Sequence, residues 1–366
     1  MYVDSSTVGG LVDALAAVPR AADEQLMVLT SHGVPEGLPA LAKALHARNI
    51  PAFGAAFPGI FADNAFHETG AIGLPVALRG SPRIVDNSRS AWALLPEATS
   101  GDLSATKHTA ILFFCSPNYE VSELITQVYD RWGPMASYLG GGAGSAFYRG
   151  GPSVFAGPDT TNRGAVLAIA RMHTTLDVTH GWEPVAGPLL ASRCSRNVIH
   201  ELNWQPAVTM YRNTLPGSLE ISDEQDLISR VFPQFPLAVG ENDSGQCVVR
   251  SPLGIDDNGG LVFACGVAEN TTLYIAQATP EKLREATEEL TVLAPTEETV
   301  RYSLMISCVS RQTYLGQSRF VDELEAVGQR AGSPAYGIAS IGEIASNGER
   351  YFETHSKALA VARIHA

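Results

Sequence analysis

The stretch Leu26-Met27-Val28-Leu29-Thr30-Ser31-His32-Gly33 is a short apolar run closed by a polar break, and it opens the pattern that decides the fold. Apolar residues then recur at the spacing of one helix face: Leu38, Leu41, Ala42 and Leu45. After this predicted helix come Pro51-Ala52-Phe53-Gly54 and a second glycine, Gly59. A strand, a loop, an amphipathic helix and a glycine-containing strand are typical of a βαβ unit, whose two strands run parallel.

The same pattern occurs twice more along the chain. The second copy has a strand at 111–114, a helix at 121–132 and the glycines 140–142. The third copy has a strand at 303–306, a helical stripe at Phe320, Leu324 and Val327, and then Pro334-Ala335-Tyr336-Gly337 with Gly342. We therefore predict an α/β protein with layered mixed sheets and flanking helices, built from internally repeated βαβ-type units in two domains.

The polar stretch 216–225 is the best candidate for a domain boundary in this chain of 366 residues. We expect one domain at residues 1–218, which binds a ligand, and a second domain at residues 219–366.

Composition excludes several classes of protein. The chain has 25 basic and 38 acidic residues, a formal net charge of −13, so it repels phosphate backbones and nucleic acid is not an expected partner. Apolar runs such as residues 110–115 are far shorter than the roughly 20 residues that cross a bilayer. The first residues, Met1-Tyr2-Val3-Asp4, lack the features of a secretion signal. We expect a cytoplasmic protein that does not bind membranes.

Motifs of the common enzyme classes are missing from the sequence. Residues 140–145 form neither a dinucleotide-binding fingerprint nor a P-loop, and the chain has no G-x-S-x-G or H-E-x-x-H. The five cysteines include no C-x-x-C pair, which argues against a zinc ribbon or covalently attached haem. A Cys308–His355 nucleophile–base pair leaves a cysteine-dependent hydrolase open as an alternative, but we expect a protein that is not an enzyme.

The order of further motifs resembles the FIST proteins, which are sensory domains of bacterial signalling systems. In the N-terminal half the resemblance is carried by residues 138–144, 154–157, 164–166, 181–185, 196–202 and 205–211. In the C-terminal half it is carried by 249–250, 307–311, 336–344 and His355. Ser310 stands where the family usually has a glycine, and Ser356 stands where an asparagine tends to occur.

This resemblance implies a sensor of intracellular signal transduction that binds an amino acid or a similar small carboxylate. The expected ligand-binding residues are Gly140, Gly141, Gly142, Cys308, Arg311, Tyr336, Gly342, Glu343 and His355. Glycine brings backbone N–H groups close to a carboxylate, and arginine binds carboxylates through two parallel hydrogen bonds. Glu343 is suited to hold an ammonium group, so Arg311 and Glu343 would clamp the two ends of a zwitterion.

Structural roles for the same residues stay open. The glycines are equally consistent with close packing between sheets, and Arg311 and Glu343 with internal ion pairs, including one between them. Cys308 fits a packed thiol, Tyr336 a core side chain and His355 a hydrogen-bonded structural histidine.

Haem b is the second possible ligand. Some proteins that resemble this one bind haem b, sense nitric oxide and act on a partner histidine kinase. A haem sensor needs an axial ligand, usually histidine, in an apolar pocket, but no spacing singles out one of the nine histidines. The chain contains no recognisable kinase, cyclase or DNA-binding segment, so its signal must pass to a separate protein such as a histidine kinase.

Overall fold

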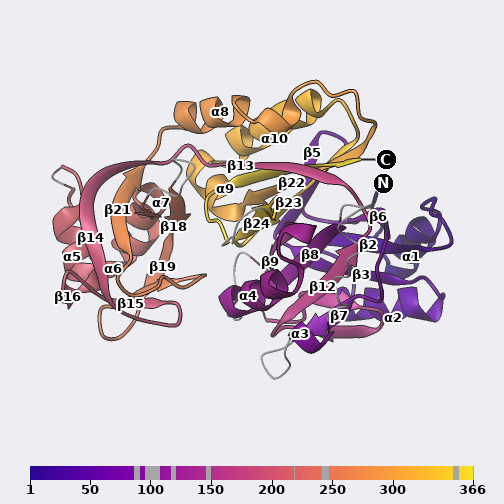
Figure 1. Ribbon diagram of the computed structural model, residues 1–366, viewed down its shortest axis with the longest axis horizontal. Helices are drawn as coiled ribbons and strands as arrows, with labels where there is room; N and C mark the ends of the chain where they lie inside the picture. Colours follow the sequence, from indigo (N-terminus) through magenta and orange to yellow (C-terminus); the bar gives the residue numbers. More distant parts are fainter. Residues whose placement is uncertain are drawn as a thin grey trace.

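The computed structural model describes residues 1–85, 91–94, 108–116, 121–145, 150–217, 219–240, 247–348 and 354–365. It confirms a mixed α/β architecture with four sheets and flanking helices (Figure 1). In these residues, none of the helices combines the length and the apolar character that crossing a membrane requires.

Three of the sheets contain the three predicted repeats. The first sheet has the order β1 (Tyr2–Val3), β6 (Ala71–Ala77), β2 (Glu24–Ser31), β3 (Ala52–Phe57), β10 (Val154–Ala156), β11 (Asp159–Thr161). The second has β24 (Glu343–Ser346), β9 (Ala136–Ala143), β8 (His108–Cys115), β12 (Ala165–Ala170), β7 (Arg83–Val85). The third has β13 (Thr174–Thr179), β25 (Leu359–His365), β22 (Val300–Cys308), β23 (Ala335–Ser340), β4 (Gly59–Ala62), β5 (Ala65–His67).

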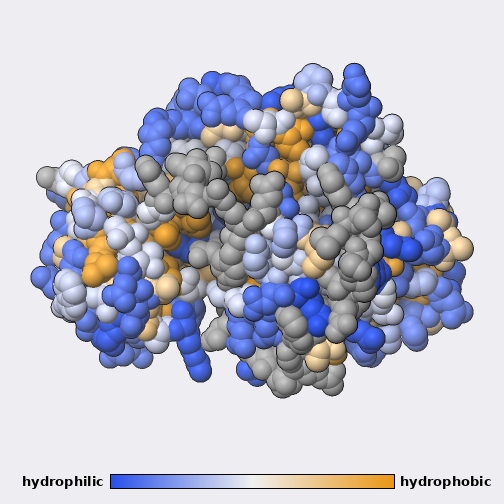
Figure 2. Space-filling view, in the orientation of Figure 1, coloured by the Kyte–Doolittle hydropathy of each residue, from blue (hydrophilic) through white to orange (hydrophobic). Residues whose placement is uncertain are grey.

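The fourth sheet forms a separate lobe, on the left in Figure 1, together with α5 to α7. Its order is β18 (Val248–Arg250), β17 (Leu237–Val239), β21 (Thr272–Gln277), β14 (Glu183–Ser195), β15 (Val198–Leu202), β20 (Leu261–Phe263), β19 (Pro252–Ile255), and β16 (Gln205–Pro206) pairs with β15. Figure 2 shows a mostly hydrophilic surface that is hollowed between this lobe and the rest of the molecule.

The helices flank the sheets. They are α1 (Val8–Ala16), α2 (Leu38–Ala47), α3 (Ala91–Leu94), α4 (Val121–Trp132), α5 (Ala207–Thr214), α6 (Glu224–Asp226), α7 (Phe232–Gln234), α8 (Pro280–Glu288), α9 (Val309–Leu315) and α10 (Gln317–Ala331). Short 3₁₀ segments lie at Gly133–Met135 and Thr291–Leu293, and a π-helical segment at Leu227–Val231.

Each predicted repeat is a βαβ unit with parallel strands. The parallel pairs are β2 with β3, β8 with β9, and β22 with β23. In every unit a later strand adds antiparallel to the first one: β6, β12 and β25 respectively. The helical stripes predicted on α2, α4 and α10 are buried as expected.

The three units exchange strands in a cycle. β10 pairs with β3, β24 pairs with β9, and β4 pairs with β23, so each unit completes another unit's sheet edge. Gly54, Gly140 and Gly337 occupy the same register in their units, opposite Val28, Leu112 and Met305. A Cβ at Gly140 would lie 1.7 Å from the Leu112 carbonyl oxygen, so this glycine allows the parallel strands to pair closely.

The faces of these three sheets share one apolar core. Side chains such as Leu29, Ile111 and Ile306 come from β2, β8 and β22 and lie in the same buried cluster. The exchange also mixes the two halves of the chain, because all sheets except the first contain strands from both sides of residue 218. The predicted division into residues 1–218 and 219–366 stays a prediction about sequence units.

Candidate functional site

A pocket of about 410 Å³ lies where the fourth-sheet lobe meets the third sheet. We call it the interlobe pocket. Its wall includes Pro58, Phe66 and Glu68 from the N-terminal half of the chain. The remaining wall residues come from the C-terminal half: Ile228, Pro233, Ser251, Pro252, Leu253, Val309, Ser310, Gln312, Thr313 and Lys357. The pocket thus combines apolar side chains with hydroxyl, amide and charged groups, as small-molecule sites commonly do.

Lys357 is the only lysine in the pocket wall, and its residue has no exposed surface. Its Nζ donates a hydrogen bond to the Pro233 carbonyl oxygen at 2.9 Å. The same nitrogen lies 4.7 Å from the ring centre of Trp182 and 6.0 Å from that of Tyr314, in the arrangement of a cation–π contact. Burial lowers the pKa of Lys357 to about 8, because the charged form loses its hydration.

Behind this wall lies a buried carboxyl group, Glu343, at the start of β24. Its Oε1 accepts a hydrogen bond from Ser340 Oγ at 2.6 Å, and its Oε2 accepts one from the Ala358 N–H at 3.3 Å. The Glu343 residue is fully buried, and burial raises its pKa to about 8. Glu343 is therefore mostly protonated at neutral pH.

Cys308, the last residue of β22, lies against Glu343. Burial, followed by the negative charge of Glu343, raises the pKa of the Cys308 thiol to about 12. A nucleophilic cysteine needs the opposite shift, because the thiolate is the reactive form. The surroundings of Cys308 therefore favour the packed thiol over the hydrolase alternative.

Arg311 lies on α9 and is fully buried. Its Nε donates to Glu323 Oε2 at 3.0 Å, and its second terminal nitrogen donates to Glu323 Oε1. The remaining terminal nitrogen donates to the carbonyl oxygens of His180 at 2.8 Å and Lys357 at 3.2 Å. Arg311 thus forms an internal ion pair, with Glu323 rather than Glu343, and holds the main chain at Lys357.

The predicted glycines lie within strand pairing beside Glu343. Gly141 is the register partner of Glu343, and the Gly142 N–H donates to the Gly342 carbonyl at 2.8 Å. A Cβ at Gly142 would lie 2.0 Å from the Ile341 carbonyl oxygen. This geometry matches the close-packing alternative. A ligand-binding role for Gly140, Gly141, Gly142 and Gly342 stays a prediction.

His355 is joined to Glu343 through the main chain. Its N–H donates to the Glu343 carbonyl at 2.7 Å, and the Glu343 N–H donates back at 3.0 Å. Burial, with smaller effects of Arg250 and His180, lowers the pKa of His355 to about 3, so its ring is neutral at physiological pH. Cys308, Glu343, Gly342 and His355 therefore lie close together in the fold, and a ligand-binding role for them stays a prediction.

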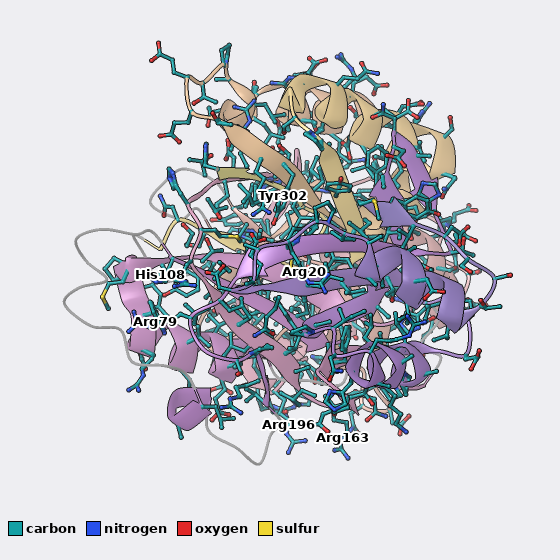
Figure 3. All side chains as sticks on the ribbon, turned by 90° about the vertical axis from the view of Figure 1, so that its right-hand side faces the viewer. Arg20, Arg79, His108, Arg163, Arg196 and Tyr302 are labelled. Atoms are coloured by element: carbon teal, nitrogen blue, oxygen red, sulfur yellow. The ribbon has the colours of Figure 1, made fainter. Side chains whose placement is uncertain are left out.

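Tyr336 is separated from this cluster. It lies four residues before Ser340 on β23, a separation of about 13 Å along an extended strand. Its ring meets that of Tyr302 edge-on at 6.3 Å, and Tyr302 lies inside the molecule (Figure 3). The core role left open for Tyr336 matches this position, whereas a ligand contact for it stays a prediction.

Sequence reasoning missed Lys357, Glu323 and the role of Trp182. Lys357 follows the His355 motif by two residues and has a φ of 58°, but nothing local indicates that its side chain is buried. Glu323 falls on the buried stripe of α10 next to Phe320 and Leu324. A carboxylate within an apolar stripe is the signal that could have found it, because buried carboxylates usually have a partner.

The comparisons with known proteins identify two family domains in the chain. The family model of the FIST N domain matches residues 25–205, and that of the FIST C domain matches residues 207–346. A comparison with curated proteins finds no match. Domains of this family are sensory domains of signal transduction. From the two adjoining matches, which span most of its length, we conclude that the chain belongs to the FIST family, with a FIST N domain followed by a FIST C domain.

Proposed function

We propose that this protein is an intracellular, non-enzymatic sensor that binds a small carboxylate, such as an amino acid, in the interlobe pocket. The observation that carries the proposal is the composition of the pocket wall. Residues of both family domains and the buried Lys357 meet around a volume of about 410 Å³, which is in the usual range for small-molecule sites.

The charges of the wall fit a zwitterion. Lys357 supplies a cationic group and Glu68 an anionic one, while Ser310, Gln312 and Thr313 supply hydrogen-bonding groups. A carboxylate near Lys357 would favour its charged form and raise its pKa. In this proposal, Lys357 and Glu68 bind the two ends of the zwitterion, which is the role expected from the sequence for Arg311 and Glu343. The Arg311–Glu323 ion pair stays intact.

Ligand binding can produce a signal because the lobe and the third sheet both contribute residues to the pocket wall. Phe66 belongs to β5 of the third sheet and Pro58 immediately precedes β4, whereas Ser251 and Leu253 belong to the lobe. A ligand that contacts both stabilises the arrangement in which they are close, and thereby shifts the population of domain arrangements. A separate signalling protein, such as a histidine kinase, would read this shift.

Haem and nitric-oxide sensing remain a prediction from the family resemblance. A haem site needs an axial ligand facing an apolar cavity. Neither the interlobe pocket nor the groove between α8 and α10 has a histidine in its wall. Among the residues that the structure describes, the pocket chemistry favours a small carboxylate, so we derive no mechanism through haem.

A thermal-shift screen with the twenty amino acids and with succinate tests the proposal. A ligand at 100 times its Kd stabilises the folded state by about 2.7 kcal/mol, so the melting temperature of the wild type should rise with at least one compound. The Lys357→Met variant should lose this rise. The matched control is Lys43→Met, at an exposed position on α2, and it should keep the rise.

Two results would contradict the proposal. One is a wild type that none of these compounds stabilises at millimolar concentration. The other is a Lys357→Met variant that binds as well as the wild type. Because Lys357→Met also changes the protein interior, Ser310→Gly provides a second variant in the pocket wall, and it should alter ligand affinity while leaving the ligand-free melting temperature nearly unchanged.

A further inference from the structure

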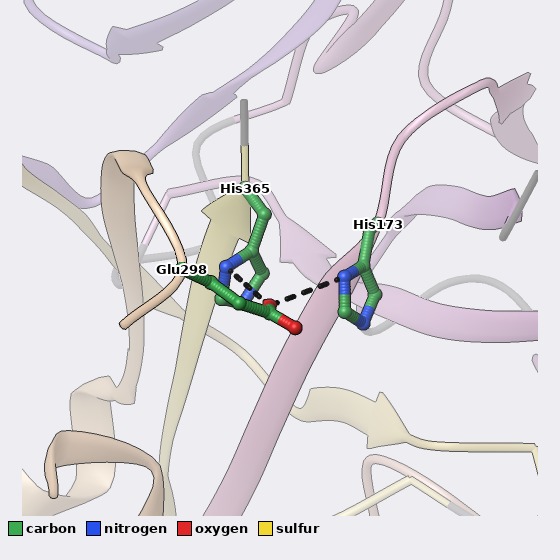
Figure 4. A group of neighbouring side chains, drawn as sticks. All are labelled: His173, Glu298 and His365. Carbon is green, nitrogen blue, oxygen red and sulfur yellow. Dashed lines mark ion pairs between the residues drawn. The ribbon is translucent and has the colours of Figure 1, made fainter. Parts of the chain in front are cut away.

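Two histidines and a glutamate converge at one end of the third sheet, opposite the end where Cys308 lies. His173 immediately precedes β13, His365 is the last residue of β25, and Glu298 lies in the segment before β22. One nitrogen or oxygen atom of each residue lies within 4.8 Å of those of the other two. Figure 4 shows both imidazole rings beside the Glu298 carboxylate.

We propose that His173, Glu298 and His365 form a binding site for a divalent transition-metal ion such as Zn²⁺. Two distances support this geometry. Glu298 Oε2 lies 2.9 Å from His365 Nδ1 and 3.5 Å from His173 Nδ1. Ligand atoms at the corners of a zinc tetrahedron lie about 3.3 Å apart, given metal–ligand bonds of about 2.0–2.2 Å. The two observed separations bracket this value.

The environment of His365 suits the binding of a cation. This residue is only 9% exposed, and its Nδ1 is a buried nitrogen without a hydrogen-bond partner, since the contact with Glu298 is not aligned as a hydrogen bond. Its Nε2 lies 2.8 Å from Thr175 Oγ1. If Nε2 donates its proton to Thr175, Nδ1 presents a lone pair to the space shared with Glu298. A lone pair and a carboxylate facing each other are stabilised by a cation between them.

This arrangement is the usual one for a metal-binding histidine. Such a histidine commonly donates its second ring N–H to an oxygen atom, which fixes the tautomer and the ring direction. Thr175 supplies that oxygen. The main-chain N–H of His365 donates to the His173 carbonyl at 3.0 Å, which holds the two residues side by side. Glu298 is 56% exposed at its side chain, so it can rotate to complete the coordination of an ion. The His173 ring, 25% exposed, stacks on the His365 ring with 4.6 Å between the ring centres.

The donor set selects the class of metal. Imidazole nitrogen suits zinc and other first-row transition ions, whereas Mg²⁺ and Ca²⁺ prefer oxygen ligands. Three protein ligands leave a fourth tetrahedral position for water or another ligand. The net charge of −13 also favours the approach of cations. The nearest cation along β25, Arg363, is directed to the carbonyl oxygens of Ala294, Leu293 and Ala331.

Calorimetric titration with Zn²⁺ tests the site, on protein without a histidine tag and after dialysis against a chelator. We expect one Zn²⁺ per chain, and no binding of Mg²⁺ under the same conditions. Glu298→Gln and His365→Ala should each weaken the affinity tenfold or more, because each loses a ligand. Thr175→Val should weaken it about tenfold through the ring orientation of His365. His46→Ala, an exposed histidine on α2, should bind like the wild type.

A second readout reports the geometry directly. Co²⁺ in place of Zn²⁺ should give the visible absorption of a tetrahedral ion in the wild type, and this absorption should be lost in Glu298→Gln. Glu298 is exposed at the surface, so this variant keeps the fold. The proposal fails if the wild type binds no Zn²⁺, or if Glu298→Gln and His46→Ala bind it equally well. In either case the cluster is a network of ion pairs and hydrogen bonds and not a metal site.

Discussion

Replacing Glu343 with glutamine tests whether a neutral carboxyl group lies at the centre of the buried cluster. Burial raises the pKa of Glu343 from its ordinary value of 4.5 to about 8 in the folded protein. Between these two values the folded state keeps a proton that the unfolded state has released. Raising the pH through this range therefore destabilises the protein, and the full stability is present only below the lower value.

The pKa values of two other buried groups limit the pH range in which the effect of Glu343 on stability can be measured alone. His355 has its pKa lowered from 6.5 to about 3, so its contribution to stability rises with pH up to 6.5. Lys357 has its pKa lowered from 10.5 to about 8, so its contribution rises above pH 8. Between pH 6.5 and pH 8, the pH dependence of the free energy of unfolding that comes from Glu343 does not overlap with that of His355 or Lys357. A difference of one bound proton between the folded and unfolded states changes the free energy of unfolding by about 1.4 kcal/mol per pH unit. Between pH 6.5 and pH 8 the change is about 2 kcal/mol.

The Glu343→Gln variant removes this titration while conserving shape. The amide oxygen can accept from the Ala358 N–H, and the Ser340 hydroxyl can accept from the amide nitrogen, so both contacts persist. Both proteins are unfolded in urea at pH 6.5, 7.0, 7.5 and 8.0. As the pH rises, the free energy of unfolding of the variant should increase by about 2 kcal/mol relative to that of the wild type.

The matched control is Glu285→Gln, at an exposed position on α8. Its difference from the wild type should stay constant over the same pH range. A constant difference for Glu343→Gln as well would refute the reasoning, because it would mean that Glu343 is already ionised at pH 6.5 in the folded protein.

Two further predictions concern the same region. Glu323→Ala leaves the buried Arg311 guanidinium without its carboxylate, and should lower the free energy of unfolding by about 3–5 kcal/mol; a loss below 1 kcal/mol in urea unfolding would show that Arg311 finds another partner. Gly140→Ala places a Cβ 1.7 Å from the Leu112 carbonyl and should cost more than about 3 kcal/mol or prevent folding. Gly150→Ala, where a Cβ meets nothing within 4 Å, should be nearly neutral, and equal melting temperatures for the two variants would contradict the close-packing argument.

The repeats were predictable because their signal is local. Each unit fits within about 35 residues. It consists of a buried strand, a helix with apolar residues every three to four positions, and a glycine-containing strand. The structure has all three units. The partners of the glycines were not predictable, because β24 reaches β9 across some 200 residues and no periodicity specifies which sheet edge a returning strand will join.

The candidate site divides in the same way. Motif order in the sequence directed attention to Cys308, Arg311, Glu343 and His355. Cys308 and His355 lie beside Glu343, whereas Arg311 pairs with Glu323. Lys357 was missed because the pattern of a surface lysine is the same as that of a buried one, and Glu323 was missed because its place on the apolar stripe of α10 was not considered. Their burial follows from the packing of α7 of the lobe against α9, and of α10 against α9 and the third sheet.

By itself, the sequence determined the class of the fold, the three βαβ units and the family, since each depends on residue types at short, fixed spacings. Only the tertiary structure decided which charges face one another. It paired Arg311 with Glu323, put Lys357 in the wall of a pocket, and brought His173 and His365 together across 192 positions of the chain. The physical reason is that ion pairs and metal ligands depend on distances of a few ångströms in space, and strand exchange among the repeats sets those distances.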